Sequence, residues 1–544
     1  MHLVAGRWMS TCYRWFMLGL LIACASSQVE SANILVSGGL GDGSHFLSIV
    51  PIGRSLLQKG HNVTFLVADE YLHEAVGSVS DSKLFNFEVF HFPGLIDKMD
   101  GAYSRLGEIV FTESIISQQK QLLQPVTIIS GQACRAVFED PELLERMRWY
   151  DAYVLDVVWP CGVFVKSYLE RHRDTKDIPI AIFAPMVPIP FIFDQSGSPF
   201  VPSYQPVLLT MLSSSMSFFE RCENVFFYIF STVASKDVFL NHYSKLVPEY
   251  NLDPDLTSTI SAHVDLYFIN SDISGEFVFS LMPNVIPVGG VTSRPASLLD
   301  EDLEEFMESS GVHGVLVFSL GSYFAQITTS HPHVIDMFIE AFSRIPQKVI
   351  MHLKTLPSRK LPDSIKALPW LPLNDLMGHP KTRAVLYHGG NNGYYEALYH
   401  GVPLVVMPLA GDQYDVAVRV LSKGFGTKIN KNKLTTEHIY EQLNEVLSNP
   451  KYRATAKRLS AIFQDRPMKP ADTAAFWIET CPVLAGIVPP KLRRENLMDK
   501  FTQGKSLTED IHPLHKHGDS RSPMSRSSTP CDHLTLSLVM QQLP

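Results

Sequence analysis

The chain has 544 residues, enough for roughly two to four domains, and its 45% hydrophobic and 19% charged content excludes a chain that is disordered or collagen-like throughout. Seven cysteines are too few for a disulfide scaffold of this length. The net charge of −9 excludes a global positive field for nucleic acid, so an anionic ligand must be held by local donors.

Residues 1–32 are typical of a secretory signal peptide. Arg7 and Arg14 supply positive charge, Trp15 to Cys24 form a short apolar run, and Ala23 to Ala25 are small enough for cleavage. The run is shorter than the roughly 20 residues that cross a bilayer. An uncleaved N-terminal anchor is the alternative interpretation.

Cleavage leaves an odd, sparse set of cysteines, which allows at most one or two bridges in an oxidising compartment. The sequence does not decide how they pair. They are Cys134, Cys161, Cys222, Cys481 and Cys531.

Two later segments are apolar but cannot span a membrane. Val225 to Phe230 is too short, and Phe183 to Phe193 carries three prolines. We expect both to be buried in the core, with peripheral contact at a membrane surface as the alternative.

The chain after the signal opens with a strand, a helix and a second strand. Asn33 to Ser37 is a buried strand, and the glycine-rich turn 38–43 leads into a helix that stops near Gly60. Asn62 to Val67 is the next strand. Later strands of this half are predicted at Ala152 to Leu155 and Ile180 to Phe183.

A second round of alternating elements begins near residue 311. Its predicted helix is Val334 to Phe342, and its strands are Val315 to Ser319, Lys348 to His352, Ala384 to Tyr387 and Leu404 to Met407. Alternation predicts an α/β protein with two doubly wound parallel sheets. We place the domains at 33–285 and 286–479. Residues 480–544, rich in Pro, Ser, His and charge, form a largely disordered tail.

Common cofactor and metal motifs are incomplete. The turn at 38–43 is not a dinucleotide fingerprint, because Ser44 stands where the third glycine is needed. Two acidic D-x-D triplets, 253–255 and 300–302, are treated as surface charge rather than as metal ligands.

The strongest functional segment is Trp370 to Gln413. Within it, Tyr387 to Glu396 follows a strand and opens a helix that we expect to end at Gly401. Glycines let a ligand approach the backbone, and the free N–H groups and positive dipole end of the helix suit a diphosphate. Glu396, one turn inside the helix, can accept hydrogen bonds from ribose hydroxyls.

This segment and its surroundings closely resemble the signature of the UDP-glycosyltransferase family, which includes the animal UDP-glucuronosyltransferases. The pattern H-G-G-x-N-G-x-x-E fixes six residues, for which chance matches number on the order of 10⁻⁵ in this chain. The resemblance covers about residues 33–479. The other motifs that carry it include Trp370-Leu371-Pro372, Asp375-Leu376, His379-Pro380, His400-Gly401-Val402-Pro403, Asp412-Gln413, Phe318 to Ser322 and Gly43-Ser44-His45.

The resemblance implies the two-domain GT-B fold, with a lipophilic acceptor in the N-terminal domain and a UDP-sugar in the C-terminal domain. It implies no metal and no cofactor. Carried over to this chain, the UDP-sugar site has Trp370 for uracil, Ser319 or Ser322 with His388, Asn392 and Gly393 for the diphosphate, Glu396 for the ribose, and Asp412 and Gln413 for the sugar. Gly321 and Gly390 belong to the same UDP-sugar site.

The resemblance also implies that His45 is the catalytic base and Asp156 its partner. The chemistry is consistent, because an imidazole with an ordinary pKa near ~6.5 can take the acceptor's proton at neutral pH. A carboxylate on the other ring nitrogen fixes the tautomer. Backside attack by the acceptor would invert the anomeric centre.

Several residues depart from the family pattern. Leu373 stands where the family usually has Gln, Tyr387 replaces a Thr or Ser, and the segment after Asp412-Gln413 loses the usual Pro and Asn. Residues 269–271 lack the basic residue that is frequent in glucuronosyl members. No membrane-spanning segment follows Glu479, where family members have one.

We therefore expect a UDP-glycosyltransferase that moves a glucuronosyl or glucosyl group to a hydroxyl of a small lipophilic acceptor. The alternative is a catalytically weak isoform that assembles with full-length relatives, so homo- or hetero-oligomers are expected partners in that case. The expected location is the lumen of the endoplasmic reticulum or the exterior, with peripheral membrane contact as an option and no nucleic-acid partner.

Overall fold

The computed structural model describes residues 31–487, except residues 42, 80, 81, 173–176, 322, 323, 325 and 326 and the side chains of residues 235, 237 and 481–487. Nearly all of the predicted signal peptide, most of the predicted tail and the predicted site residue Ser322 lie outside the described residues. Their interpretations remain predictions, as do the limits of the two domains.

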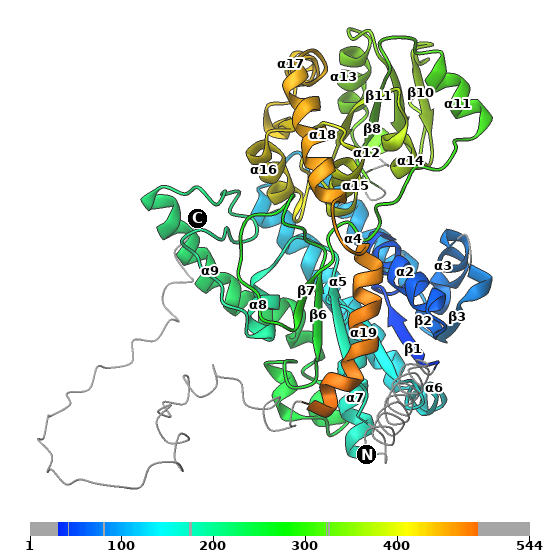
Figure 1. Ribbon diagram of the computed structural model, residues 1–544, viewed down its shortest axis with the longest axis vertical. Coiled ribbons are helices and arrows are strands. Elements are labelled where there is room, and N and C mark those ends of the chain that lie inside the picture. The colour runs from blue at the N-terminus through cyan, green and yellow to red at the C-terminus, as the bar shows by residue number, and fades with distance from the viewer. Residues whose placement is uncertain are drawn as a thin grey trace, which may run out of the picture. The chain divides into compact units, whose positions relative to one another are not determined.

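The first sheet is seven-stranded and parallel throughout (Figure 1). In spatial order its strands are β3 (Asn86–Phe90), β2 (Asn62–Ala68), β1 (Asn33–Ser37), β4 (Ala152–Asp156), β5 (Ile180–Ala184), β6 (Leu266–Ile269) and β7 (Val285–Pro287). The helices between them are α2 (Gly43–Gln58), α3 (Leu72–Ser78), α4 (Leu95–Ile109), α5 (Ile115–Phe138), α6 (Pro141–Met147), α7 (Cys161–His172), α8 (Pro190–Ser196), α9 (Phe218–Phe239) and α10 (Leu246–Glu249).

The second sheet is six-stranded and also parallel. Its spatial order is β10 (Ile365–Leu368), β9 (Lys348–His352), β8 (Val315–Ser319), β11 (Thr382–Tyr387), β12 (Leu404–Val406) and β13 (Gly426–Lys428). Its helices are α11 (Glu301–Glu308), α12 (Ile327–Ser330), α13 (Pro332–Phe342), α14 (Leu373–Gly378), α15 (Asn391–His400), α16 (Gln413–Lys423), α17 (Thr436–Ser448) and α18 (Pro450–Gln464). The predicted α/β class and two parallel sheets are confirmed.

Each sheet has a hydrophobic core on both faces, because successive side chains of a strand point to opposite sides. In β1, Leu35 joins one core while Ile34 and Val36 join the other. In β8, Leu316 and Val317 divide in the same way between the two cores of the second sheet. This double burial explains why the strands are nearly continuous apolar runs rather than alternating ones.

Both sheets share one topology, in which the chain starts centrally, moves to one edge and then returns to fill the other side. The reversal falls between β1 and β4 in the first sheet and between β8 and β11 in the second. Open parallel sheets bind ligands beyond the carboxyl ends of the strands at such reversals. The topology therefore creates two candidate positions for chemistry.

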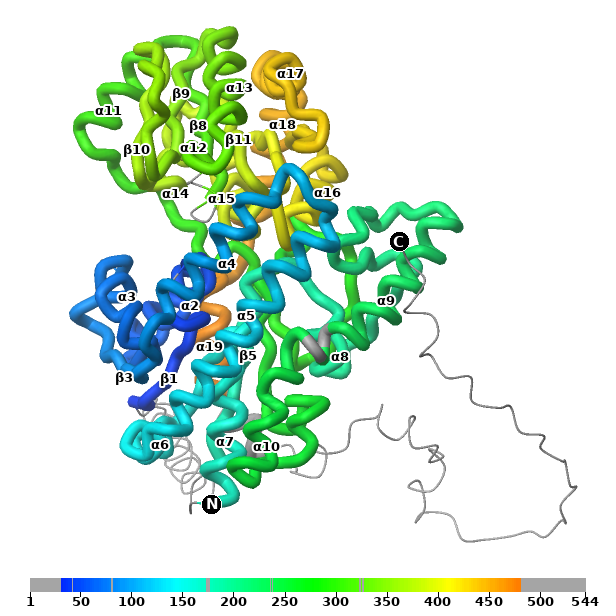
Figure 2. Tube along the Cα trace, turned by 180° about the vertical axis from the view of Figure 1, so that it is seen from behind, coloured from blue at the N-terminus to red at the C-terminus, as the bar shows by residue number. Residues whose placement is uncertain are grey.

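The last described helix, α19 (Pro470–Ile487), packs beside α2 of the first sheet (Figures 1 and 2). Ala474, Ala475 and Ile478 join a core of that sheet. Polar contacts hold it there, since Glu479 accepts from Lys59 Nζ at 2.5 Å and pairs with His61 Nε2 at 3.1 Å. The chain thus crosses back after completing the second sheet.

Cys134 of α5 and Cys161 of α7 form a disulfide, which answers the pairing question that the sequence left open. Cys222 is a free, exposed thiol on α9. The thiols of Cys481 and Cys531 lie outside the described side chains.

The two apolar segments differ in their surroundings. Phe183 to Phe193 runs through β5 and α8, and its large apolar side chains are buried, as predicted, except the partly buried Met186. The prediction for Val225 to Phe230 is wrong, because four of its side chains on α9 are exposed, with Phe226 65% exposed. A helix can direct its apolar stripe away from the core when another surface is to cover it.

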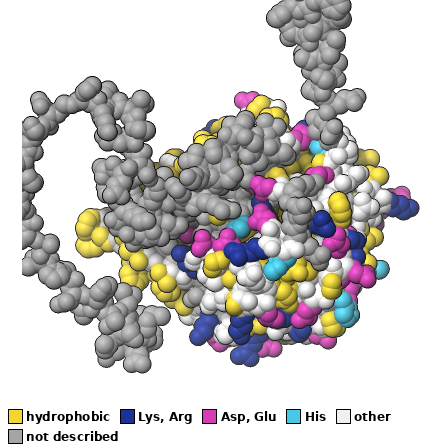
Figure 3. All heavy atoms as spheres, turned by 90° about the horizontal axis from the view of Figure 1, so that it is seen from below, with side chains coloured by type: hydrophobic (Ala, Val, Ile, Leu, Met, Phe, Trp, Pro, Cys, Tyr) yellow, Lys and Arg dark blue, Asp and Glu magenta, His cyan; other side chains and the backbone are white. Residues whose placement is uncertain are grey.

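Within the described part of the chain, no helix combines the length and apolarity that a membrane crossing requires. On the face seen in Figure 3, the Lys and Arg side chains are interspersed with Asp and Glu side chains. This mixture agrees with the small net charge relative to the chain length.

Candidate active site

The first candidate position holds a histidine and a carboxylate in contact. His45 Nδ1 lies 2.8 Å from Asp156 Oδ2, and the Asp156 side chain is fully buried while that of His45 is 30% exposed. Asp156 Oδ1 also accepts the Val158 N–H at 2.7 Å, which fixes the carboxylate. A carboxylate at Nδ1 holds the proton there and leaves Nε2 as the nitrogen that can accept another proton.

The fold explains how residues 111 positions apart meet. Asp156 is the last residue of β4, and His45 is the third residue of α2, which follows β1. β1 and β4 are parallel neighbours, with Ser37 opposite Leu155, so their carboxyl ends lie together. The pair therefore occupies the reversal point of the first sheet.

The second candidate position collects most of the predicted donor-binding residues. Ser319 ends β8, His388 follows β11, and the His388 N–H donates to the Ser319 carbonyl at 3.3 Å. Gly321 has a left-handed backbone, with φ of 78°. A Cβ there would lie 2.6 Å from the His388 ring, so this glycine is required for the close approach.

His388 is uncharged at physiological pH. Burial is the main cause that lowers its pKa to about 3, and its buried Nδ1 has no hydrogen-bond partner among the described residues. A buried polar atom without a partner costs free energy unless something satisfies it. A ligand oxygen beside the start of α15 would satisfy it.

Asn392 is engaged between the two candidate positions. Its side-chain amide donates to Ser48 Oγ of α2 at 2.7 Å, and its amide oxygen accepts from Asn270 Nδ2 at 3.1 Å. Asn270 is 1% exposed and also accepts the Gly290 N–H. Asn392, which is predicted to bind the diphosphate, thus also connects the helix of His45 with the donor side.

Glu396 has a buried carboxyl group in the donor set. Burial raises its pKa to about 7, and hydrogen bonding from Thr292 opposes that shift. Thr292 Oγ1 donates to Glu396 Oε1 at 2.9 Å. Nearby, the Arg294 guanidinium donates two hydrogen bonds to the Asp375 carboxylate, to Oδ1 at 2.7 Å and to Oδ2 at 2.8 Å.

The predicted uracil platform is open to solvent. Trp370 is 62% exposed, and its ring stands perpendicular to that of His352 at 6.1 Å. An exposed indole of this kind offers a face to a base. Leu373, where the family usually has Gln, is partly buried against the core of the second sheet, so its side chain contributes packing.

The predicted sugar-binding pair lies at the start of α16. Burial raises the pKa of Asp412, and a hydrogen bond from the Val187 backbone is the main cause that opposes that rise. Asp412 Oδ2 accepts the Val187 N–H at 3.3 Å. Gln413 Oε1 accepts the backbone N–H groups of Leu409 and Ala410, which shapes the turn before the helix.

One departure from the family pattern changes the donor side. Tyr387 is 5% exposed, and its hydroxyl lies where a Cβ on Gly393 would come within 2.5 Å. A Cβ on Gly390 would lie 2.9 Å from the same hydroxyl. The bulky phenol therefore fills space directly below the turn that is predicted to hold the diphosphate, and both glycines are needed to fit it.

Sequence reasoning missed three residues that contact the candidate site, namely Ser48, Asn270 and Thr292. Ser48 lies one turn after His45, a spacing that could have indicated a shared face. Asn270 and Thr292 lie in short, irregular stretches with no periodic signal. Only long-range contacts reveal them.

A cluster that could hold a metal lies apart from this site. Glu304, Glu308 and His379 bring their ligand atoms within 4.8 Å of one another. Glu308 already pairs with Lys381 at 3.2 Å, and His379 Nε2 lies 3.3 Å from Glu304 Oε1. None of the predicted catalytic or donor-binding residues takes part.

Comparison with known proteins agrees with this geometry. A family model described as "UDP-glucoronosyl and UDP-glucosyl transferase" matches residues 33–486. UDP-glucuronosyltransferase 2A1 of Mus musculus is 32% identical over 490 residues, covering 85% of this chain and 88% of the relative. UDP-glucuronosyltransferase 2A3 of Cavia porcellus is 33% identical over 474 residues, covering 85% and 86%.

Solved structures share the fold at low sequence identity. Spinosyn forosaminyltransferase SpnP has a TM-score of 0.56 at 14% identity, covering 83% of this chain and 99% of its own. The calicheamicin glycosyltransferase CalG4 has a TM-score of 0.52 at 17% identity, covering 85% and 100%. The predicted GT-B architecture is confirmed. The chain belongs to the UDP-glucoronosyl and UDP-glucosyl transferase family and is a glycosyltransferase that uses a UDP-sugar.

Proposed function

We propose that the chain transfers a glucuronosyl or glucosyl group from its UDP-sugar to a hydroxyl of a small lipophilic acceptor, with inversion. The observation that carries this proposal is the contact of His45 with buried Asp156, on a helix whose Ser48 accepts a hydrogen bond from Asn392 of the donor side. A base beside the donor side is what acceptor activation needs.

In the proposed reaction, His45 Nε2 removes the proton from the acceptor hydroxyl as its oxygen attacks the anomeric carbon. The bond between that carbon and the diphosphate oxygen breaks, and UDP leaves with the electron pair. Asp156 stabilises the imidazolium that forms. The N–H groups at the start of α15 stabilise the charge that develops on the diphosphate.

The donor sugar is the point on which two observations diverge. The relatives named above are glucuronosyltransferases. Asn270, however, makes only amide and carbonyl contacts, and its segment supplies no cation for a glucuronate carboxylate. We propose both donors, with UDP-glucose as the better substrate because a neutral hexose needs no counter-charge.

The decisive experiment measures UDP release with 4-nitrophenol as acceptor and UDP-glucose or UDP-glucuronate as donor. Turnover with either donor supports the proposal. His45→Ala should lose this turnover. His73→Ala is its matched control, because His73 is an exposed histidine outside the site. No release above background with either donor and a panel of phenols and steroids would favour the catalytically weak isoform that assembles with relatives.

We propose that neither a metal nor a cofactor takes part. The donor side supplies helix N–H groups and neutral amides for the diphosphate, and the one described metal-like cluster lies outside it. Activity unchanged by EDTA is expected, and loss of activity that Mg²⁺ restores would contradict this.

We also propose a lumenal or secreted location after signal cleavage, with peripheral membrane contact through α9. Residues 224–234 of this helix carry no charge, and its exposed apolar side chains include Phe219, Phe226, Ile229 and Phe230. Such a face suits the boundary between headgroups and acyl chains. The buried segment 183–193 is unsuited to that role.

A further inference from the structure

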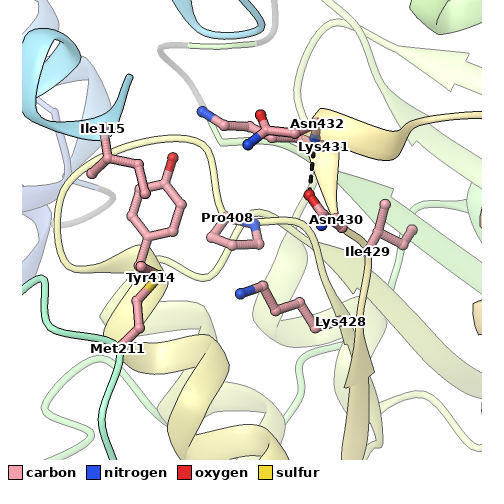
Figure 4. A pocket seen from close by; sticks show the side chains of 9 residues that line it. All are labelled: Ile115, Met211, Pro408, Tyr414, Lys428, Ile429, Asn430, Lys431 and Asn432. Atoms are coloured by element: carbon pink, nitrogen blue, oxygen red, sulfur yellow. Dashed lines mark hydrogen bonds between the residues drawn. The ribbon is translucent and has the colours of Figure 1, made fainter. Parts of the chain in front are cut away.

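A cavity of about 190 Å³ is lined by none of the residues assigned to catalysis or donor binding, although its Tyr414 directly follows Gln413 (Figure 4). Its apolar walls come from Ile115 at the start of α5, Met211, Pro408 and the ring of Tyr414. Lys428, the last residue of β13, supplies the polar end together with the side-chain amides of Asn430 and Asn432. None of the lining residues belongs to the predicted active site.

Lys428 is a cation without a counter-charge. Its ammonium group points into the cavity between Pro408 and Met211 in Figure 4. Within the described part of the chain, it has no hydrogen bond or ion pair, and burial is what lowers its pKa. Half-buried charges are normally paired, so an unpaired ammonium facing a cavity favours an anion there.

The second lysine that lines this cavity, Lys431, already donates hydrogen bonds to protein atoms. Lys431 Nζ donates to the carbonyls of Val110 and Leu409 at 2.6 and 3.0 Å and to Gln118 Oε1 at 3.0 Å. Among the described residues it pairs with no carboxylate, and burial lowers its pKa to about 8. Lys431 therefore adds positive potential to the cavity while its donors stay occupied.

The segment that carries Met211 is held in an unusual conformation. Leu209 and Met211 have left-handed backbones, with φ of 69° and 57°, although neither is glycine. Asp415 accepts the Leu209 N–H at 3.0 Å and anchors the segment. Strained backbone of this kind persists where the surroundings impose it, and it is frequent at ligand sites.

We propose that this cavity binds a compact organic anion, an apolar or aromatic body bearing one carboxylate, with the carboxylate on Lys428 and the body against Ile115, Met211 and Tyr414. The apolar walls exclude a small, fully hydrated anion such as inorganic phosphate as the preferred ligand. The site is separate from the His45 centre, so it does not rest on the proposed reaction.

The test is calorimetric titration of the full chain with 3-phenylpropionate, alongside its neutral isostere 3-phenylpropanamide and inorganic phosphate. We expect the carboxylate to bind at least about tenfold more tightly than the amide, the usual scale for one hydrogen bond to a charged group. Phosphate should bind more weakly than the carboxylate.

Two variants assign the binding to this cavity. Lys428→Met should remove the tenfold preference for the carboxylate, while Lys433→Met, which removes an exposed lysine five residues later, should retain it. Ile115→Glu should also abolish the preference, because a glutamate at the first turn of α5 would supply the counter-charge internally. Equal affinities in wild type and Lys428→Met, or for carboxylate and amide, would overturn the proposal.

Discussion

At the scale of single residues, the proposed reaction depends on His45 as the base and on Asp156 as its partner. His45→Ala should lower kcat by about 10²–10⁴-fold, the usual range for a general base. UDP affinity should stay unchanged, because His45 belongs to a helix of the first sheet, whereas the predicted donor-binding residues belong to the second sheet. Steady-state UDP release and UDP titration measure the two quantities, and near-normal turnover would remove His45 from the proposed role.

Glu396 predicts a pH dependence of UDP binding. Its pKa is raised to about 7 by burial, so the carboxylate that is predicted to accept from ribose hydroxyls is fully present only above that value. UDP affinity should therefore rise as pH increases from 6 to 8. Glu396→Gln should flatten this part of the profile, and an unchanged profile in that variant would assign the dependence to another group.

The same shift has a consequence for stability. A carboxyl whose pKa is higher in the folded state disfavours folding once it ionises, so stability should fall as pH rises from the ordinary value of 4.5 towards 7. Thermal unfolding should show a smaller loss in Glu396→Gln than in the wild type, because Asp415, whose pKa burial also raises to about 7, contributes the same trend to both.

Thr292 is a positioning residue that the sequence did not indicate. Its hydroxyl orients Glu396, so Thr292→Val should weaken UDP binding by roughly 0.5–1.5 kcal/mol, the net value of one hydrogen bond. Thr292→Ser keeps the hydroxyl and should restore most of the affinity. Equal weakening in both variants would point to lost packing of the methyl group instead.

At the scale of elements, α9 carries an apolar face that is exposed in the part of the chain that the structure describes. Replacing Phe226 and Phe230 together by Ser should reduce flotation of the protein with phospholipid vesicles, because two large exposed side chains would be lost from the contact. Leu298→Ser is the control, since Leu298 is 98% exposed elsewhere. Undiminished flotation of the double variant would exclude α9 as the contact.

At the scale of the whole molecule, α19 joins the end of the described chain to the first sheet. Glu479→Ala removes the contacts with Lys59 and His61 and should lower the free energy of unfolding by about 1–2 kcal/mol. Glu441→Ala, at an exposed position of α17, should cost much less. Denaturant unfolding measures the free energy of unfolding of both variants. Equal values for Glu479→Ala and Glu441→Ala would mean that α19 is held by its apolar face alone.

Local sequence determined most of the elements. The strands at 33–37, 315–319 and 348–352 follow directly from short apolar runs, and the helix after Tyr387 ends before Gly401, whose left-handed backbone favours glycine. The family signature placed the donor segment because its residues are close together in the chain. These are features that a chain specifies over a few residues.

Only the tertiary structure decided which distant residues meet. Asn270 and Thr292 carry no periodic pattern, yet they contact Asn392 and Glu396 across more than a hundred positions. The outward direction of the α9 stripe, the return of α19 and the unpaired charge of Lys428 depend in the same way on what packs against each of them. Apolarity and charge are properties of a residue, whereas burial and pairing are properties of its neighbours, and parallel sheets draw those neighbours from remote parts of the chain.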